Sequence, residues 1–325
     1  MRRNKSAVCC LLLALALLCG CSSDTAAAQP HTVALVAKST QTEFWLSVFA
    51  GAEAAAAEYN MQLSIIGPET EEDYETQNQM VADAVADGAE AIVFSAIDYE
   101  NNAAAIDAAA KAGVKVVAID SNVDSEAVST YIGTDNYAAG QMAAQAALDR
   151  VEGTLHVGVV NYDISSANGQ EREQGAVDTF AASGRAEITA VINTLAEAGH
   201  AQSDTIAMLQ QHPEINVLLA FNEPTCVGAA GAVETLGLAD TVFLVGFDSN
   251  VVTVDGLQEG SVDALIVQNP YAMGYLGVES AYKLLSGQGS DLDKTVDTST
   301  KIVDRSNIFT IDSQKALFAF EQREN

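Results

Sequence analysis

The stretch DGAEAIVFSAIDYENNAAAIDAAAKAGVKVVAID, residues 87–120, contains two short apolar runs separated by an alanine-rich segment of helical length. The runs, at 91–96 and 114–120, are nearly continuous in apolar residues, which is typical of strands buried on both faces of a parallel sheet. A strand, a helix and a second strand in this order form the unit from which α/β folds are built. The stretch therefore predicts a parallel sheet that is covered by helices.

The same alternation continues along the chain. Seven further apolar runs lie at 33–37, 63–67, 156–160, 188–193, 217–222, 242–248 and 264–269. About nine strands are more than one small Rossmann-like unit uses, and the pattern starts again near Thr134, just before the helical segment 137–150. We therefore predict an α/β chain with two doubly wound, Rossmann-like lobes of parallel sheet.

Composition excludes several classes of protein. The 325 residues include 15 Lys and Arg against 44 Asp and Glu, which gives a net charge of −29. Such a polyanion is repelled by phosphate backbones and by anionic lipid surfaces, so we expect no binding to nucleic acid. Hydrophobic residues make up 49% of the chain, which excludes a disordered acidic tail and favours a large core. The length favours two domains.

The N-terminus has the features of an export signal. Three basic residues precede an apolar run at 7–19, which is too short to cross a bilayer as a stable helix. The sequence LCGC at 18–21 resembles the lipobox of bacterial lipoproteins, in which the final Cys is acylated. We predict a signal peptide over 1–20, lipidation of Cys21 and a flexible tether over 21–31. An ordinary cleaved signal is the alternative.

The cysteines follow this division. Four of the five lie in the first 21 residues, and only Cys226 lies in the body of the chain, so no intrachain disulfide can form there. Removal of residues 1–20 takes away three positive charges and no negative ones. The exported protein then has 12 basic and 44 acidic residues, a net charge of −32.

Polar residues end most of the apolar runs. In doubly wound sheets, ligands bind beyond the carboxyl ends of the strands, so these residues are candidates for a binding site. They are Lys38, Asp120, Asn161, Asn193, Asn222, Asp248 and Gln268. Each of them could instead form a turn or cap a helix.

Eight segments, taken in order, resemble the ribose-binding-protein family of periplasmic solute-binding proteins that serve ABC transporters. The segments lie at 32–45, 87–98, 112–120, 129–140, 170–180, 212–237, 242–248 and 264–279, and the resemblance extends over roughly 32–305. It implies the type I periplasmic binding protein fold, with a three-segment hinge between its lobes. Lobe one would comprise 32–135 and 269–297, and lobe two 136–268 and 298–325.

The resemblance also implies site residues in the first lobe. Phe44 and Trp45 stand where family members place aromatic rings that sandwich the sugar, and Thr42 stands near a polar contact. Asp120 matches a family Asp whose carboxylate accepts two hydroxyl hydrogen bonds, and Ser121 follows it where the ribose-binding protein has Arg. Alternatively, Phe44 and Trp45 belong to the buried face of the first helix.

In the second lobe, the resemblance implies polar contacts from Asn222, Asp248 and Gln268 and an aromatic contact from Phe247. Arg172 lies near the family's arginine, although strict alignment favours Gln170 as the contacting residue. Arg172 could instead pair with a neighbouring glutamate, Glu171 or Glu173, on a solvated helix face.

Lys38 departs from the ribose binders, which have a small polar residue at this position. Together with Asp120 and Ser121 it resembles the autoinducer-2 and rhamnose branch of the superfamily, in which a Lys contacts the ligand. A Lys that ends a buried strand needs water or a partner. Lys38 could therefore form a structural salt bridge with Asp120 or Glu43.

No sequence motif indicates an enzyme, a cofactor or a metal. The chain has no G-x-G-x-x-G after its first strand, no Walker A sequence and no G-x-S-x-G elbow, and its four His residues lack metal-ligand spacing. We expect an exported, lipid-anchored monomer that binds a monosaccharide or related polyol by hinge closure and delivers it to an ABC permease. The alternative is a ligand sensor that acts on a chemoreceptor or a histidine kinase.

Overall fold

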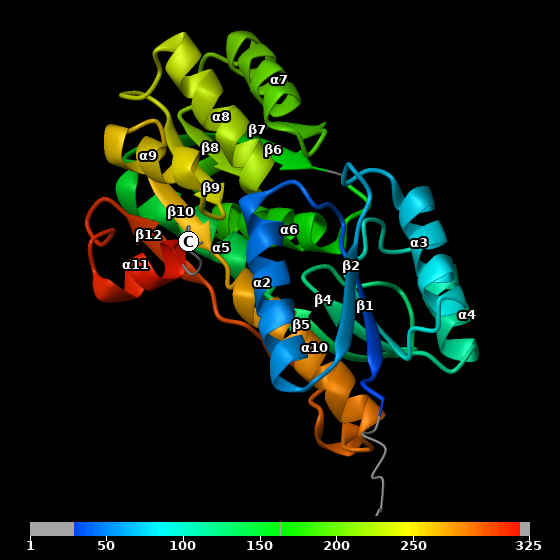
Figure 1. Cartoon of the computed structure of the whole chain (residues 1–325). Coiled ribbons are helices and arrows are strands. Elements are labelled where there is room, and N and C mark those ends of the chain that lie inside the picture. The colour runs from blue at the N-terminus through cyan, green and yellow to red at the C-terminus, as the bar shows by residue number, and fades with distance from the viewer. Residues whose placement is uncertain (1–28, 163, 319–325) are drawn as a thin grey trace, which may run out of the picture. The chain divides into compact units, whose positions relative to one another are not determined.

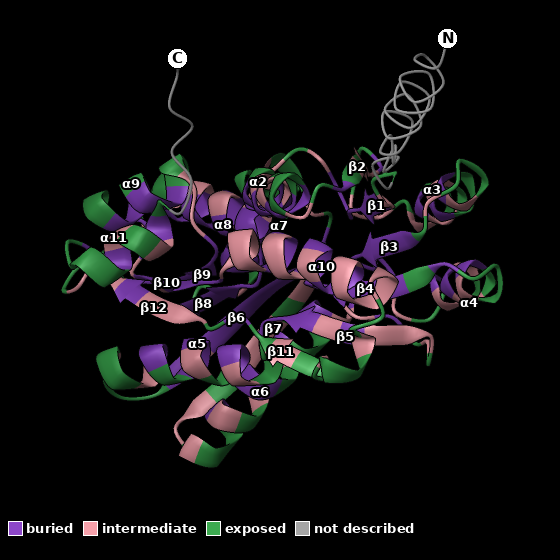
Figure 2. Ribbon diagram, turned by 60° about the horizontal axis from the view of Figure 1, so that its bottom comes forward, coloured by how far each residue is buried: buried purple, intermediate pink, exposed green. Residues whose placement is uncertain are grey.

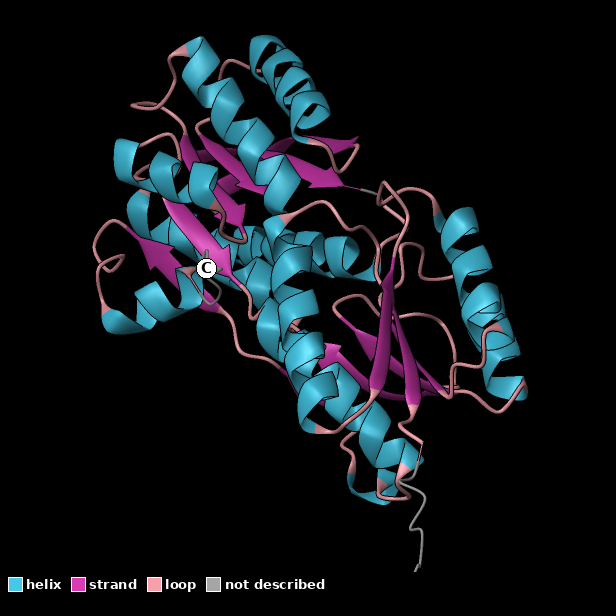
Figure 3. Ribbon diagram, viewed as in Figure 1, coloured by secondary structure: helices cyan, strands magenta, loops and turns pink. Residues whose placement is uncertain are grey.

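The computed structural model describes residues 29–162 and 164–318. Within these residues most strands are followed by helices, and the strands form two six-stranded sheets (Figure 3). We call each sheet, with the helices that cover it, a lobe. The predicted signal peptide, Cys21 and most of the tether lie outside the described residues. Within the described residues, no helix has the length and hydropathy that are needed to cross a membrane.

Lobe one contains an entirely parallel sheet. Its strands, in spatial order, are β11 (Thr295–Asp297), β5 (Val128–Gly133), β4 (Lys115–Ile119), β3 (Ala91–Phe94), β1 (Thr32–Val36) and β2 (Gln62–Ile66). One face is covered by α2 (Glu43–Glu58) and α10 (Pro270–Leu285), and the other by α3 (Tyr74–Ala86) and α4 (Ala103–Lys111) (Figure 1). A short 3-10 helix, η1 (Gly289–Asp291), follows α10.

Lobe two repeats this order of strands. They are β12 (Lys301–Asp304), β10 (Ala264–Val267), β9 (Phe243–Phe247), β8 (Val217–Ala220), β6 (Leu155–Tyr162) and β7 (Ala186–Thr194). Helices α5 (Asn136–Arg150) and α6 (Ala167–Ser183) cover one face; α7 (Ala198–Gln211), α8 (Glu223–Leu236), α9 (Val251–Glu259) and α11 (Ile311–Leu317) lie on the other. Only β12 is antiparallel to its neighbour, where the sequence predicted parallel strands throughout.

The core of each lobe lies on both faces of its sheet, as Figure 2 shows by the buried strands at the centre. Successive side chains of a strand point to opposite faces, so Val33 and Leu35 of β1 pack toward α2 and α10. Ala34 and Val36 pack toward α3 and α4. This two-sided burial is the physical reason for the continuous apolar runs.

Each of the nine predicted runs coincides with a strand, but three strands were not predicted. β5, with the sequence VSTYIG, alternates apolar and polar residues, and β11 and β12 are short edge strands. Two of the nine runs form edge strands rather than buried ones, because β2 and β7 each have a single neighbour in the sheet. Edge strands need less apolar sequence, which explains why β11 and β12 were missed. β5 lies inside its sheet and was missed because polar residues interrupt its apolar ones.

The chain passes three times between the sheets, after β5, after β10 and after β11. In both lobes the order of the first five strands is second, first, third, fourth, fifth, so the order reverses between the first and third strands. Ligands bind in the crevice at such a reversal, outside the carboxyl ends of the strands. The fold therefore directs attention to the loops after β1, β3, β6 and β8.

In each lobe, a close pair of helices positions the site. Gly51 of α2 and Gly274 of α10 lie where a methyl group would overlap the backbone of the other helix. In lobe two, Gly140 of α5 lies against the carbonyl of Arg172 in α6 in the same way. Glycine permits this approach because it has no Cβ.

Candidate functional site

A cavity lies between the two lobes at the carboxyl ends of their strands. It encloses about 290 Å³ of space between atoms, including its opening to solvent. Lobe one lines it with Lys38, Thr42, Phe44, Trp45, Glu71 and Asp120. Tyr162, Asn168, Arg172, Asn222, Glu223, Pro224, Asp248 and Gln268 line the rest.

Nine of the twelve predicted residues line this cavity, and three do not. Ser121 is buried, and its hydroxyl has no hydrogen-bond partner among the described residues. Phe247 is also buried and lies beneath the guanidinium of Arg172 rather than facing the cavity. Gln170 is exposed. Side chains two positions apart in a helix point about 200° apart around the helix axis. Gln170 and Arg172 therefore cannot both face the cavity, and Arg172 is the one that does.

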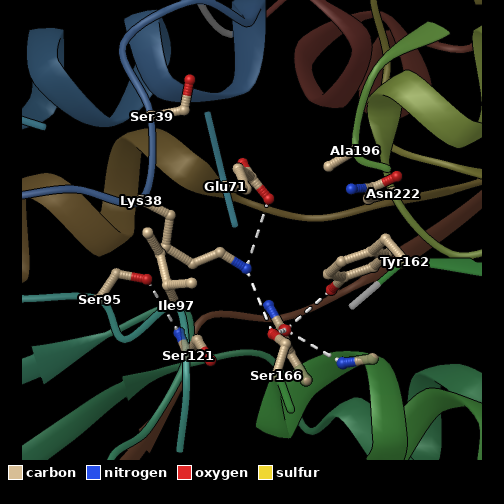
Figure 4. Close-up of polar contacts among 12 residues, drawn as sticks. Lys38, Ser39, Glu71, Ser95, Ile97, Ser121, Tyr162, Ser166, Ala196 and Asn222 are labelled. Atoms are coloured by element: carbon tan, nitrogen blue, oxygen red, sulfur yellow. Dashed lines mark hydrogen bonds and ion pairs between the residues drawn. The ribbon is translucent and has the colours of Figure 1, made fainter. Parts of the chain in front are cut away.

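Lys38 lies inside the cavity and also forms an ion pair, although not with the partners expected from the sequence. Its ammonium nitrogen is 3.5 Å from Glu71 Oε2 and donates to Ser166 Oγ at 3.3 Å, as Figure 4 shows. The same nitrogen lies 5.1 Å from the centroid of the Tyr162 ring. Burial alone would lower the pKa of Lys38, but its interactions with Glu71, Tyr162 and Asp120 outweigh burial and raise that pKa.

Helix α2 begins at the cavity, and its first turn carries the aromatic residues. Thr42 is the N-cap and accepts a hydrogen bond from Trp45 N. The Phe44 and Trp45 rings meet edge to face, at 87° with centroids 5.3 Å apart, so they cannot both stack on one face of a sugar. Both side chains also pack in the core, and Trp45 Nε1 donates to Glu71 Oε1 at 2.9 Å. Phe44 and Trp45 therefore lie on the buried face of α2 and also line the cavity, and the sandwich of a sugar ring between them stays a prediction.

Asp120 and Asp248 occupy equivalent positions in the two lobes, directly after β4 and β9. Each has a left-handed backbone, with φ of 57° and 68°, which aspartate tolerates better than most residues. Asp120 accepts hydrogen bonds from Ser95 Oγ and Asn168 Nδ2, and Asp248 accepts one from Gln268 Nε2 at 2.6 Å. Burial raises the pKa of both carboxyl groups, that of Asp248 to about 7.

Arg172 is buried and does not lie on a solvated helix face. Its guanidinium donates to Asn136 Oδ1, to the carbonyl of Phe221 and to Gln268 Oε1, and it lies 4.5 Å from the centroid of the Phe247 ring. Gln268 Oε1 also accepts from Thr134 Oγ1 at 2.8 Å. The arginine is thus fixed by neutral acceptors from three segments: the start of α5, the end of β8 and the end of β10, where the chain leaves lobe two.

Asn222 is the N-cap of α8 and forms a capping box with Thr225. Its side-chain oxygen accepts from Thr225 N at 3.0 Å, so its amide nitrogen points away from the helix. That nitrogen is buried and has no hydrogen-bond partner among the described residues, and Asn222 itself lines the cavity. Because buried donors are nearly always paired, Asn222 Nδ2 is suited to donate to an acceptor in the cavity.

The sequence reasoning missed five lining residues: Glu71, Tyr162, Asn168, Glu223 and Pro224. Glu71 lies five residues beyond the end of β2, so a search of strand ends does not reach it. Tyr162 directly follows Asn161, which was selected; because side chains alternate along a strand, Asn161 faces away and donates to Glu173. Glu223 follows Asn222, and a search one residue past each strand end would have found it.

Comparison with known proteins agrees with this geometry. The chain matches a family model described as a periplasmic binding protein domain over residues 33–289. The D-ribose/D-allose-binding protein of Pseudomonas aeruginosa is 29% identical over 310 residues, which cover 90% of this chain and 97% of that protein.

Two solved structures have the same fold. A carbohydrate transporter solute-binding protein from Agrobacterium radiobacter, in complex with D-arabinose, is 26% identical with a TM-score of 0.85, covering 89% of this chain and 99% of that one. An ABC transporter solute-binding protein from Agrobacterium vitis, with bound D-fucose, is 28% identical with a TM-score of 0.85, covering 88% and 100%. These relatives are binding proteins of transport systems and not enzymes. The chain belongs to the periplasmic binding protein family.

Proposed function

We propose that the chain captures a small neutral sugar or related polyol between its lobes and delivers it to an ABC permease. The observation that carries this proposal is the set of polar groups that both lobes direct into one cavity, above all the unpaired amide of Asn222. Carboxylates such as Asp120 and Asp248 accept hydroxyl hydrogen bonds, and amide and guanidinium groups donate them. The rim of a sugar requires both kinds of partner.

The charges in the cavity favour a neutral ligand. Lys38 is already paired with Glu71, and Arg172 is held by three acceptors of the protein. Each cation is thus satisfied without an anionic ligand. Four carboxyl groups line the cavity, which disfavours a sugar acid further. Lys38 remains available as a donor to a ligand hydroxyl or carbonyl.

The remaining parts of the proposal concern the ends of the chain and the hinge. Export requires the signal at 1–20, and acylation of Cys21 would anchor the protein through the tether 21–31. Lobe one would comprise 32–135 and 269–297, and lobe two 136–268 and 298–325. The three connections between the sheets would then act as the hinge.

A calorimetric screen of the mature chain tests the proposal. The panel contains D-ribose, D-allose, D-arabinose, D-fucose and an autoinducer-2 analogue, with a sugar acid as the charged comparison. We expect a neutral member to bind and the sugar acid not to bind. Asn222→Ala removes one donor and should weaken binding by roughly tenfold, since a hydrogen bond of this kind contributes about 1 kcal/mol or more. Absence of binding by every neutral member would contradict the proposal.

A further inference from the structure

Two carboxylates outside the predicted site cross from one lobe to the other. Glu223, at the start of α8 in lobe two, accepts hydrogen bonds from Phe44 N at 2.9 Å and from Glu43 N at 3.3 Å in lobe one. Asn250 Nδ2 donates to the same carboxylate at 2.9 Å and orients it. The Glu223 carboxylate is therefore held at the N-terminus of α2.

The start of α2 needs such a partner. The first N–H groups of a helix have no acceptor within the helix, and they attract negative charge. Thr42 caps only the N–H of Trp45, so the N–H groups of Glu43 and Phe44 depend on Glu223. If the lobes separated, these groups and the carboxylate would have to be paired with water instead.

The second carboxylate makes the reciprocal contact. Glu72, in the loop between β2 and α3 of lobe one, accepts a hydrogen bond from Ala196 N at 2.8 Å. Ala196 lies between β7 and α7 of lobe two. Each lobe thus extends one glutamate to backbone N–H groups of the other.

Both carboxylates are also neighbours of residues that line the cavity. Glu223 follows Asn222 and binds the N–H of Phe44, while Glu72 follows Glu71, which contacts Lys38 and Trp45. A ligand held by Asn222, Phe44 or Glu71 therefore fixes the backbone on either side of these two contacts.

We propose that Glu223 and Glu72 are positioning residues that fasten the closed lobes and couple closure to ligand retention. This inference rests on the proposed function. Glu72 is not among the residues that line the cavity; Glu223 lines it, but its carboxylate is held by the N–H groups of Glu43 and Phe44 and by Asn250. The loss of either contact should therefore act mainly on the rate of ligand dissociation rather than on association. Because the contacts join the lobes, their loss should also open the cleft when no ligand is present.

The experiment compares Glu223→Gln, Glu72→Gln and the double variant with two matched controls. Glu234→Gln lies in the same helix as Glu223, and Glu69→Gln lies in the same loop as Glu72. Both control residues are exposed, and within the described residues neither makes a hydrogen bond or an ion pair with the other lobe. Glu72 is only half-buried, so its variant should fold even if Glu223→Gln proves unstable. Circular dichroism checks the fold of each variant.

Two measurements are made on each variant. The first is the dissociation rate of the tightest-binding neutral sugar of the panel. We expect this rate to rise on the order of tenfold for Glu223→Gln and for Glu72→Gln, which we call the latch variants together with the double variant, and more for the double variant. The second is acrylamide quenching of Trp45 without ligand. Trp45 is the only Trp and is 1% exposed at the cavity wall, so quenching should increase when the lobes separate. The controls should leave both values unchanged.

The outcomes separate the two proposals. If the latch variants match their controls in both measurements while sugar still binds, the coupling is wrong and the proposed function stands. If no sugar binds even the unchanged protein, the proposed function fails. In that case the quenching of Trp45 is the remaining test of whether Glu223 and Glu72 hold the lobes together. Increased quenching in the latch variants but not in the controls would support this role, and equal quenching would contradict it.

Discussion

The two lobes build equivalent walls of one cavity with different chemistry. Each places an aspartate with a left-handed backbone after its fourth strand, and each contributes one buried cation. In lobe one the cation, Lys38, is neutralised by a carboxylate, Glu71. In lobe two the cation, Arg172, is held by amide and carbonyl oxygens and by an aromatic ring.

The difference changes what each cation does. Lys38 and Glu71 form a compact pair whose members can be removed separately, and Glu71 keeps its bond to Trp45 when Lys38 is lost. Arg172 joins three segments of chain through a planar fork that lysine cannot reproduce. We infer that lobe one uses its cation mainly for contact with ligand, whereas lobe two also uses its cation to hold its own strand ends together.

The largest effect that follows concerns Arg172. Arg172→Met leaves the buried oxygens of Asn136, Phe221 and Gln268 unpaired, and we expect a loss of about 3 kcal/mol or more in the free energy of unfolding. Urea unfolding of the ligand-free protein measures this loss. Lys38→Met is the matched change in lobe one, and it should cost less than Arg172→Met because Glu71 keeps partial access to solvent and the indole donor of Trp45. Equal losses in the two lobes would contradict the distinction.

The close helix pairs provide a second comparison. Gly274→Ala forces α10 away from α2, and Gly140→Ala forces α5 away from the backbone of Arg172. Overpacking of this kind costs about 1–3 kcal/mol, so thermal unfolding should show both proteins destabilised. We expect only Gly140→Ala to weaken sugar binding beyond its loss of stability, because it displaces the segment that carries Arg172.

The control for this comparison is Gly199→Ala in α7, where an added methyl group meets no atom within 4 Å. Alanine favours a helix more than glycine does, so this variant should be as stable as the unchanged protein or slightly more stable. Equal weakening of sugar binding by Gly140→Ala and Gly274→Ala would contradict the prediction that only the α5–α6 contact positions a binding residue, Arg172.

The strands and the site residues differ in how well the sequence predicts them. Parallel strands that are covered on both faces need continuous apolar sequence, so nine of the twelve strands were recognisable, whereas β5 and the short edge strands carried no such signal. Strand ends located Lys38, Asp120, Asn222, Asp248 and Gln268, because topology gathers the carboxyl ends of the strands at the cavity. The same search also selected Asn161 and Asn193, which do not line it, so topology alone does not fix which way a side chain faces.

Residues placed by loops or by helix rotation were less accessible. Glu71 enters the cavity because the loop after β2 folds back over Trp45, and no local pattern specifies this path. The choice between Gln170 and Arg172 depends on how α6 is rotated against α5, which is set by the contact of Gly140 with α6. The contacts of Glu72 and Glu223 between the lobes join segments that are far apart in the sequence.

The last comparison of the two aspartates is made through the pH dependence of stability. Burial raises the pKa of Asp248 to about 7, and the unfolded chain has an ordinary aspartate pKa near 3.8. The folded protein therefore binds the proton more tightly, and the stabilisation from protonated Asp248 is complete below pH 3.8 and is lost as the pH rises toward 7. One proton limits the slope to about 1.4 kcal/mol per pH unit. Asp248→Asn should remove this contribution.

The measurement is the difference in the free energy of unfolding between Asp248→Asn and the unchanged protein, taken by urea titration from pH 4 to pH 8. Carboxyl groups whose pKa is lowered in the fold, such as those of Asp98 and Asp304, act in the opposite direction, but they are common to both proteins and cancel in the difference. The advantage of the asparagine variant should grow with pH and level off above about 7. A flat difference would mean that Asp248 is ionised throughout, as strong pairing with Arg172 would require. Asp120→Asn tests the equivalent position in lobe one, where Lys38 and Arg172 both oppose the rise in pKa that burial causes.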